Sequence, residues 1–192
     1  MKYCWILDNG HGVDTAGKRS SVLPDGRQLL EYEFNRAVVN SLAALLNNAG
    51  FSYHILVPEL VDVSLAERVN RANALSGQPR RLISIHGNSA VNELVWHSAT
   101  GIETFHYPGS QTGAELAEVF QRHLIAGTKW RNRGVKTDKF YILRHSNMPA
   151  ILTENGFYSN LNECTCMLDN EWRDVIALAH FNAIAEIENA TV

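Results

Sequence analysis

Short apolar runs alternate with longer segments of helical periodicity along the whole chain. The apolar runs are rich in Ile, Val, Leu and aromatic residues, which predicts buried strands at 3–8, 51–57, 81–86, 102–107, 140–144 and 150–154. Between these runs, the spacing of apolar residues predicts helices at about 31–49, 64–76, 110–126 and 170–188. The second helix opens with Ser64 and Glu67, which have the spacing of a capping box.

This alternation predicts an α/β fold with three layers, in which a twisted, mostly parallel six-stranded sheet has helices on both faces. We find no internal repeat, low-complexity tract or linker rich in Pro, Gly or Ser, so we expect residues 1–192 to form one domain. In such folds, functional side chains gather beyond the carboxyl ends of the strands.

Composition and charge argue against several classes of partner. Hydrophobic residues make up 45% of the chain and charged residues 19%, which is typical of a globular protein. The net charge of −3 provides no overall basic field for nucleic acid. We interpret the one local group of basic residues as a solvated loop; it consists of Lys129, Arg131, Arg133, Lys136 and Lys139. There is no run of 18 apolar residues, so we expect no membrane span.

The cysteines and the first residues of the chain indicate the cellular compartment in which the protein is made. Cys4, Cys164 and Cys166 are odd in number and two of them lie two positions apart, which argues against a disulfide framework. Metal contact by Cys164 and Cys166 is an alternative, but we favour thiols without a role. Residues 1–8 are too short for a signal peptide and lead directly into a polar turn. We therefore expect synthesis in the cytoplasm without an evident export signal.

Three polar residues follow predicted strands. His11 comes after the first strand, between two glycines that allow a tight turn, and His86 closes the third strand. Glu154 lies near the end of the last strand. Because the carboxyl ends of parallel strands meet at one edge of a sheet, we expect these side chains to lie together.

Helix geometry adds Glu31 to this group in preference to Glu33. At about 100° per residue, Glu33 falls on the polar face of the predicted helix. Glu31 shares an arc with apolar residues, namely Phe34, Val38, Leu42, Leu45 and Ala49. A carboxylate at the head of an apolar stripe is costly unless a cation or hydrogen-bond donors satisfy it.

Two imidazoles and one carboxylate, with a position left for water, are the ligand set of a catalytic zinc site. We therefore predict that His11, Glu31 and His86 bind one Zn²⁺ per chain. Bound zinc lowers the pKa of a water molecule to about 7. Glu154 is not needed as a ligand and suits the transfer of that proton to a leaving nitrogen. Each residue alone is weak evidence, and the hypothesis depends on all four converging.

Motifs along nearly the whole chain occur in the same order as in a known enzyme family. They are Leu7–Gly12, Glu31–Asn35, Ser84–Ala90, Gly101–Phe105, Arg133–Lys136, Phe140–Arg144 and Pro149–Asn160. These segments resemble the zinc-dependent N-acetylmuramoyl-L-alanine amidases of the amidase-3 family, which includes bacterial cell-separation enzymes and phage endolysins. Asn9 stands where the family usually has Pro, and Gly87 where it usually has Ala.

The resemblance implies a role for each of the four residues. His11, Glu31 and His86 would be the zinc ligands and Glu154 the catalytic acid and base. The implied reaction is hydrolysis of the amide between the lactyl group of N-acetylmuramic acid and L-alanine of the stem peptide, in a single catalytic domain. The partner would be peptidoglycan, reached by phage-type release or another export route.

Other assignments are more open. Asn88 and Arg144 are expected near the same edge of the sheet, where they are candidate contacts for substrate carbonyls or carboxylates. The alternative for each is an ordinary structural hydrogen bond. A zinc peptidase or deacylase acting on another small N-acyl amide would use the same four residues. A non-catalytic wall-binding module would be expected to have lost one of them. Host, stem-peptide preference, regulation and oligomeric state stay open, with a monomer favoured.

Overall fold

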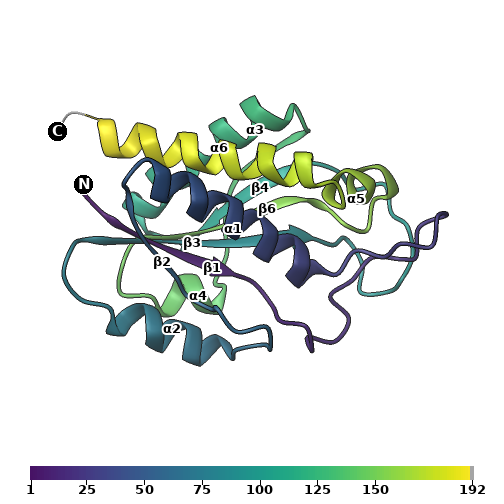
Figure 1. Cartoon of the computed structure of the whole chain (residues 1–192), viewed down its shortest axis with the longest axis horizontal. Coiled ribbons are helices and arrows are strands. Elements are labelled where there is room, and N and C mark those ends of the chain that lie inside the picture. Colours follow the sequence, from purple (N-terminus) through teal and green to yellow (C-terminus); the bar gives the residue numbers. More distant parts are fainter. Residues whose placement is uncertain (191–192) are drawn as a thin grey trace.

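The computed structural model describes residues 1–190 and confirms the predicted three-layer α/β architecture (Figure 1). Six strands form one sheet in the order β2-β1-β3-β6-β4-β5. The strands are β1 (Cys4–Asn9), β2 (Ser52–Ile55), β3 (Arg80–Asn88), β4 (Ile102–His106), β5 (Asn132–Thr137) and β6 (Ala150–Phe157).

The sheet is mostly parallel, as predicted, but it contains one reversal. Strands β2, β1, β3 and β6 run parallel to one another, whereas β4 runs antiparallel to β6 and parallel to β5. The carboxyl ends of β1, β3 and β6 therefore meet at one edge, together with the amino end of β4. In this register Glu154 lies between His86 of β3 and Glu103 of β4.

Helices cover both faces of the sheet. On one face lie α1 (Glu31–Asn48), α3 (Gln111–Thr128), α5 (Leu161–Met167) and α6 (Asn170–Asn189), and on the other α2 (Leu65–Ala74) and α4 (Tyr141–His145) (Figure 1). The Ser64 hydroxyl accepts a hydrogen bond from the Glu67 amide at 3.2 Å, so the predicted cap of α2 is present. Within residues 1–190, no helix combines the length and apolar character needed to cross a bilayer.

Two predictions about the segment 129–144 are wrong. The apolar run 140–144 is mostly helix α4, in which Ile142 and Leu143 are buried against the sheet. A run this short does not distinguish a strand from a buried helical turn. The fifth strand is instead β5, in the segment that we interpreted as a solvated loop. As an edge strand paired only with β4, it can be polar and half-exposed, so it carries no apolar signal.

A buried histidine connects α6 to the strand that carries Glu154. His180 is fully buried, with Nδ1 at 2.8 Å from the Ile176 carbonyl oxygen and Nε2 at 3.0 Å from the Thr153 hydroxyl. Burial lowers the pKa of His180 from 6.5 to about 4. The side chain therefore folds as a neutral imidazole.

We expect acid to destabilise the fold through His180. The unfolded chain takes up the proton first, so the stabilising contribution is complete above pH 6.5 and is lost as the pH falls toward 4. Between pH 7 and 4.5 the free energy of unfolding of the wild type should fall by about 2 kcal/mol more than that of His180→Gln. Urea unfolding at both pH values measures this difference, and equal losses in the two proteins would contradict the assignment.

Candidate metal centre

Three side chains from distant segments meet at the carboxyl edge of the sheet. His11 lies two residues beyond the end of β1, Glu31 is the first residue of α1, and His86 lies in β3. Oε1 of Glu31 lies 3.3 Å from His11 Nε2 and 3.0 Å from His86 Nδ1. One potential ligand atom from each residue lies within 4.8 Å of the other two. We call these three residues the metal centre.

The turn after β1 requires glycine beside His11. His11 itself has a φ of 64°, in the left-handed region that few side chains adopt. A Cβ at Gly10 would lie 2.0 Å from Cε1 of His86. The absence of a side chain at position 10 therefore allows the two imidazoles to approach each other, with ring centroids 5.1 Å apart.

Glu31 is the buried carboxylate of the metal centre, with 1% of its surface exposed, whereas Glu33 is exposed as helix geometry predicts. Burial alone would raise the pKa of Glu31, but hydrogen bonds and charge interactions with His11 and His86 outweigh it and hold the pKa well below its usual range. Burial likewise lowers the pKa of His86, and the Glu31 carboxylate outweighs that effect and raises it. Glu31 and His86 thus stabilise each other's charged forms.

The residues present fit a zinc ion. Oε2 of Glu31 is buried without a hydrogen-bond partner among the described residues, and a cation satisfies such an atom. Ligand atoms about 2.0–2.1 Å from a tetrahedral zinc lie about 3.3 Å apart. The two separations between Glu31 and the histidines match this spacing.

Glu154 lies on β6 next to the metal centre. Burial raises the pKa of Glu154 to about 8; the nearby His86 lowers it and the negative charges of Glu31 and Glu103 raise it further. Its Oε2 is buried and lacks a hydrogen-bond partner within residues 1–190. Glu154 is therefore a carboxyl group that can hold a proton near neutral pH.

Two cavities, of about 390 and 320 Å³, meet at the metal centre. Both are lined by His11, Lys18, His86 and Glu154. The larger cavity extends toward α2 and α4 and is lined by apolar side chains that include Val63, Leu65, Phe140, Ile142 and Leu152. The smaller one is lined by polar groups that include Asn88, Ser89, Asn92 and Tyr158.

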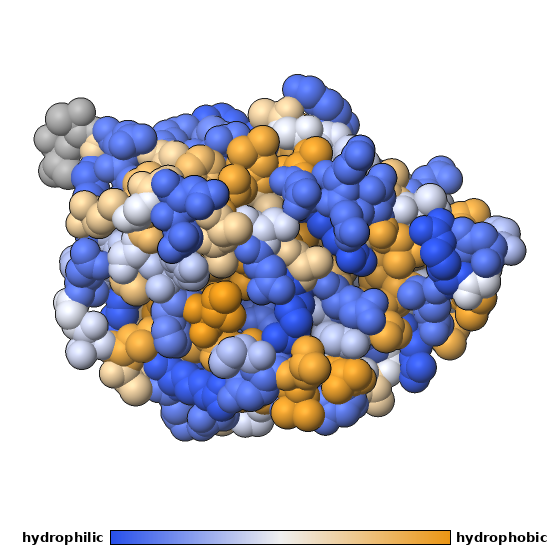
Figure 2. Space-filling model, viewed as in Figure 1, coloured by the Kyte–Doolittle hydropathy of each residue, from blue (hydrophilic) through white to orange (hydrophobic). Residues whose placement is uncertain are grey.

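The surface beside the larger cavity is partly apolar. Figure 2 shows an apolar patch on the lower edge of the molecule, near the start of α2. Leu60 and Val61, which precede this helix, and Leu65, its first residue, are more than half exposed. The larger cavity therefore opens beside a surface suited to apolar groups.

Of the two residues that we considered for substrate contact, one lines a cavity and the other does not. Asn88 lines the smaller cavity, and its amide donates to Oε1 of Glu103 at 2.8 Å. Arg144 is exposed on α4 and lines neither cavity, because the segment that carries it is a helix and not the predicted strand. A substrate contact by either residue stays a prediction.

Several charged residues around the site were not predicted. Glu103 is buried on β4 and forms ion pairs with Arg133 at 2.6 Å and with Lys136. Arg68 is buried on α2 and pairs with Asp8 at 2.7 Å. The available signal for Glu103 and Arg68 was a charged residue inside an otherwise apolar strand or helix face. Such a residue does not reveal its ion-pair partner.

The chain is similar over nearly its whole length to known proteins of one family. A family model described as N-acetylmuramoyl-L-alanine amidase matches residues 6–186. N-acetylmuramoyl-L-alanine amidase CwlM of Bacillus licheniformis is 30% identical over 96% of this chain and 68% of its own length. LytC of Bacillus subtilis is 32% identical over 91% of this chain, which spans about a third (33%) of that relative. The crystal structure of an amidase of the same description from Clostridium difficile 630 superimposes with a TM-score of 0.85 at 29% identity, covering 98% of both chains.

Proposed function

The chain belongs to the family of N-acetylmuramoyl-L-alanine amidases, and we propose that it hydrolyses the amide between N-acetylmuramic acid and L-alanine in peptidoglycan with a zinc ion held by His11, Glu31 and His86. The observation that carries the proposal is the meeting of these three side chains beside Glu154, where two cavities join. The family match rests on the sequence of residues 6–186, and the metal centre on the geometry of three side chains.

The metal ion and the protein have separate parts in this reaction. When bound, zinc polarises a carbonyl oxygen and lowers the pKa of water. His11, Glu31 and His86 hold the ion at the junction of the cavities, so the scissile amide is placed there too. Since the glycan and the stem peptide extend from opposite sides of that amide, a site with one cavity on each side suits the substrate.

Glu154 is the proton carrier in this proposal. Its carboxyl group accepts a proton from the attacking water and delivers it to the nitrogen of the departing L-alanine. The support is its position beside His86; its burial, which favours the protonated form, suits the stage at which Glu154 holds the proton before delivering it. The buried Oε2 is free for these transfers because no described residue binds it.

We extend the proposal to the organisation and place of action of the protein. Residues 1–192 form a single catalytic domain, because one sheet and its helices contain the whole site and the family match spans 6–186. The domain acts on the cell wall, where the substrate is found. The purified chain, residues 1–192, should therefore hydrolyse isolated cell walls.

Mass spectrometry of digested peptidoglycan tests the proposed bond. The expected products are intact glycan with a free lactyl carboxylate and intact stem peptide with a free L-alanine amine. Cleavage inside the stem peptide or between sugars would contradict the proposal, as would activity on other N-acyl amino acids alone.

Lys18 is a candidate contact for substrate carboxylates. It lines both cavities and forms no ion pair with a carboxylate of residues 1–190, while its carbonyl accepts from the Glu31 amide at 2.9 Å. We expect Lys18→Gln to raise KM about tenfold with little change in kcat, since a hydrogen bond to a charged group contributes about 1.5 kcal/mol or more. Lys18→Arg should retain most of the affinity.

Steady-state kinetics on muramoyl peptides with free or amidated carboxylates measure the effect of Lys18. The difference between wild type and Lys18→Gln should shrink on the amidated substrate. An unchanged KM for the variant on the free-acid substrate would show that Lys18 does not contact the substrate carboxylates.

A further inference from the structure

A buried guanidinium is connected by hydrogen bonds to both histidines of the metal centre, directly to His11 and through two side chains to His86. Arg68, on α2, has only 2% of its surface exposed, and five hydrogen bonds occupy its donor groups. They run from Nε to the Val63 carbonyl (2.7 Å), from Nη1 to Asp8 Oδ1 (2.7 Å) and the Asn9 carbonyl (2.8 Å), and from Nη2 to Asp62 Oδ1 (2.9 Å) and the His11 carbonyl (3.3 Å). A buried charge with all its donors used is held in one position.

The first branch of this network leads to His86. Asp8 binds Arg68 through Oδ1, and its Oδ2 accepts the hydroxyl hydrogen of Ser84 at 2.5 Å. Ser84 is fully buried on β3, directly opposite Asp8 on β1 in the register of the sheet. The Ser84 oxygen then lies 3.1 Å from Nε2 of His86.

The hydrogen positions in this branch determine the orientation of the His86 ring. The carboxylate of Asp8, paired with Arg68, is an acceptor, so the single hydroxyl hydrogen of Ser84 points to it. The Ser84 oxygen must then accept from Nε2–H of His86. Nδ1 is thereby directed at Glu31 and His11, and once a metal ion displaces the proton that Nδ1 shares with Glu31, its lone pair faces the metal centre as a metal ligand requires.

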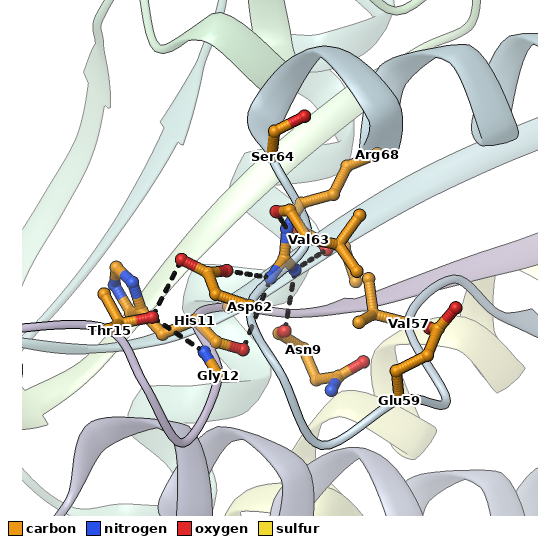
Figure 3. A network of polar contacts seen from close by, with 12 residues as sticks. Asn9, His11, Gly12, Thr15, Val57, Glu59, Asp62, Val63, Ser64 and Arg68 are labelled. Atoms are coloured by element: carbon orange, nitrogen blue, oxygen red, sulfur yellow. Dashed lines mark hydrogen bonds and ion pairs between the residues drawn. The ribbon is translucent and has the colours of Figure 1, made fainter.

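The second branch holds the turn that carries His11. Figure 3 shows Arg68 reaching from α2 to this turn, with Asp62 between Arg68 and Thr15. Asp62 Oδ2 accepts the Thr15 hydroxyl at 2.8 Å, and Thr15 in turn accepts the Gly12 amide at 2.9 Å. A Cβ at Gly12 would lie 2.1 Å from the Asp62 backbone nitrogen, so the two loops are in direct contact. The left-handed backbone of His11 is therefore held from both sides.

We propose that Arg68 is a positioning residue for both histidine ligands. Through Asp8 and Ser84 it fixes His86 with Nδ1 toward the metal, and through the His11 carbonyl and Asp62 it holds the His11 turn. Partners of this kind around metal ligands typically contribute about 10–100-fold in metal affinity or activity. The proposal rests on the zinc site proposed above. It states that Arg68, which is not itself a ligand, holds the ligands of that site in place.

The variant Ser84→Ala tests the first branch, because Arg68 itself is so extensively bonded that its replacement risks unfolding. We expect the zinc affinity of Ser84→Ala, measured by competition with a chromophoric chelator, to fall about 10–100-fold. Ser41→Ala is a matched control, since Ser41 donates to Asp174 at 2.7 Å on the surface of α1. If Ser84→Ala is folded and binds zinc as tightly as wild type, the first branch has no positioning role.

Thr15→Val tests the second branch with an almost isosteric change. We expect a loss of zinc affinity of similar size. Because both branches share Arg68, the loss in the double variant with Ser84→Ala should differ from the product of the two single losses. A Thr15→Val protein with a lower Tm but wild-type zinc affinity would show that the second branch is merely structural. Wild-type protein that fails to bind zinc would instead refute the proposed function, so the two failures are distinguishable.

The protonation of the His86 ring gives a readout that does not depend on activity. Nitrogen-15 NMR of the imidazole in the zinc-bound wild type should show hydrogen on Nε2 and none on Nδ1. In Ser84→Ala the exchange of the Nε2 hydrogen with solvent should be faster, because its acceptor is gone. Hydrogen on Nδ1 of His86 in the zinc-bound wild type would overturn the assignment.

Discussion

Replacing Glu154 with Gln is expected to reduce kcat/KM on muramoyl peptide by about 10²–10⁴-fold while the protein still binds one zinc ion. The amide keeps the shape of the side chain but carries no proton to the leaving nitrogen, and proton transfer by a positioned group contributes this much. Glu154 is not a member of the metal centre, so its replacement leaves the three ligand side chains in place.

Kinetics together with metal analysis of the purified variant check this expectation. Glu118→Gln on the exposed face of α3 is a matched control, because it makes the same chemical change far from the site. Turnover of Glu154→Gln within a few-fold of wild type would show that another group moves the proton. Loss of zinc together with activity would show that Glu154 is a ligand.

The second large effect is expected for Glu31→Gln. This change removes the only carboxylate of the metal centre, and both histidines lose the negative charge beside them. We expect zinc affinity to fall by more than the roughly 10–100-fold that outer partners contribute, and activity to be lost at micromolar zinc. Glu33→Gln, two residues further along the same helix and exposed, should behave as wild type.

Thermal unfolding with and without zinc separates a binding defect from a folding defect in Glu31→Gln. Zinc at 100 times its Kd should stabilise the wild type by about 2.7 kcal/mol and raise its Tm. The Tm of Glu31→Gln should not respond to the same concentration of zinc. An equal rise in both proteins would mean that the ion binds without Glu31.

The sequence predicts the parts of the site that local rules govern. The periodicity of α1 distinguishes buried Glu31 from exposed Glu33 because the two lie on different faces of the helix. The ends of β1, β3 and β6 bring His11, His86 and Glu154 to one edge because these strands are parallel. In both cases one geometric rule, read from neighbouring residues, is sufficient.

What could not be predicted depends on contacts between distant segments. The edge strand β5 has no apolar run, and its basic residues Arg133 and Lys136 are retained on the sheet by ion pairs with Glu103, about thirty positions away. Arg68 is similarly a single charge on a helix until the fold places Asp8 beside it. Long-range partners of this kind leave no periodic signal in one sequence.

Anomalous diffraction at the zinc absorption edge, from crystals grown with zinc, tests the central claim most directly. The account predicts one strong peak per chain, about 2.0–2.2 Å from His11 Nε2, His86 Nδ1 and a carboxylate oxygen of Glu31. A peak bound by other side chains, or an empty metal centre at saturating zinc, would contradict it.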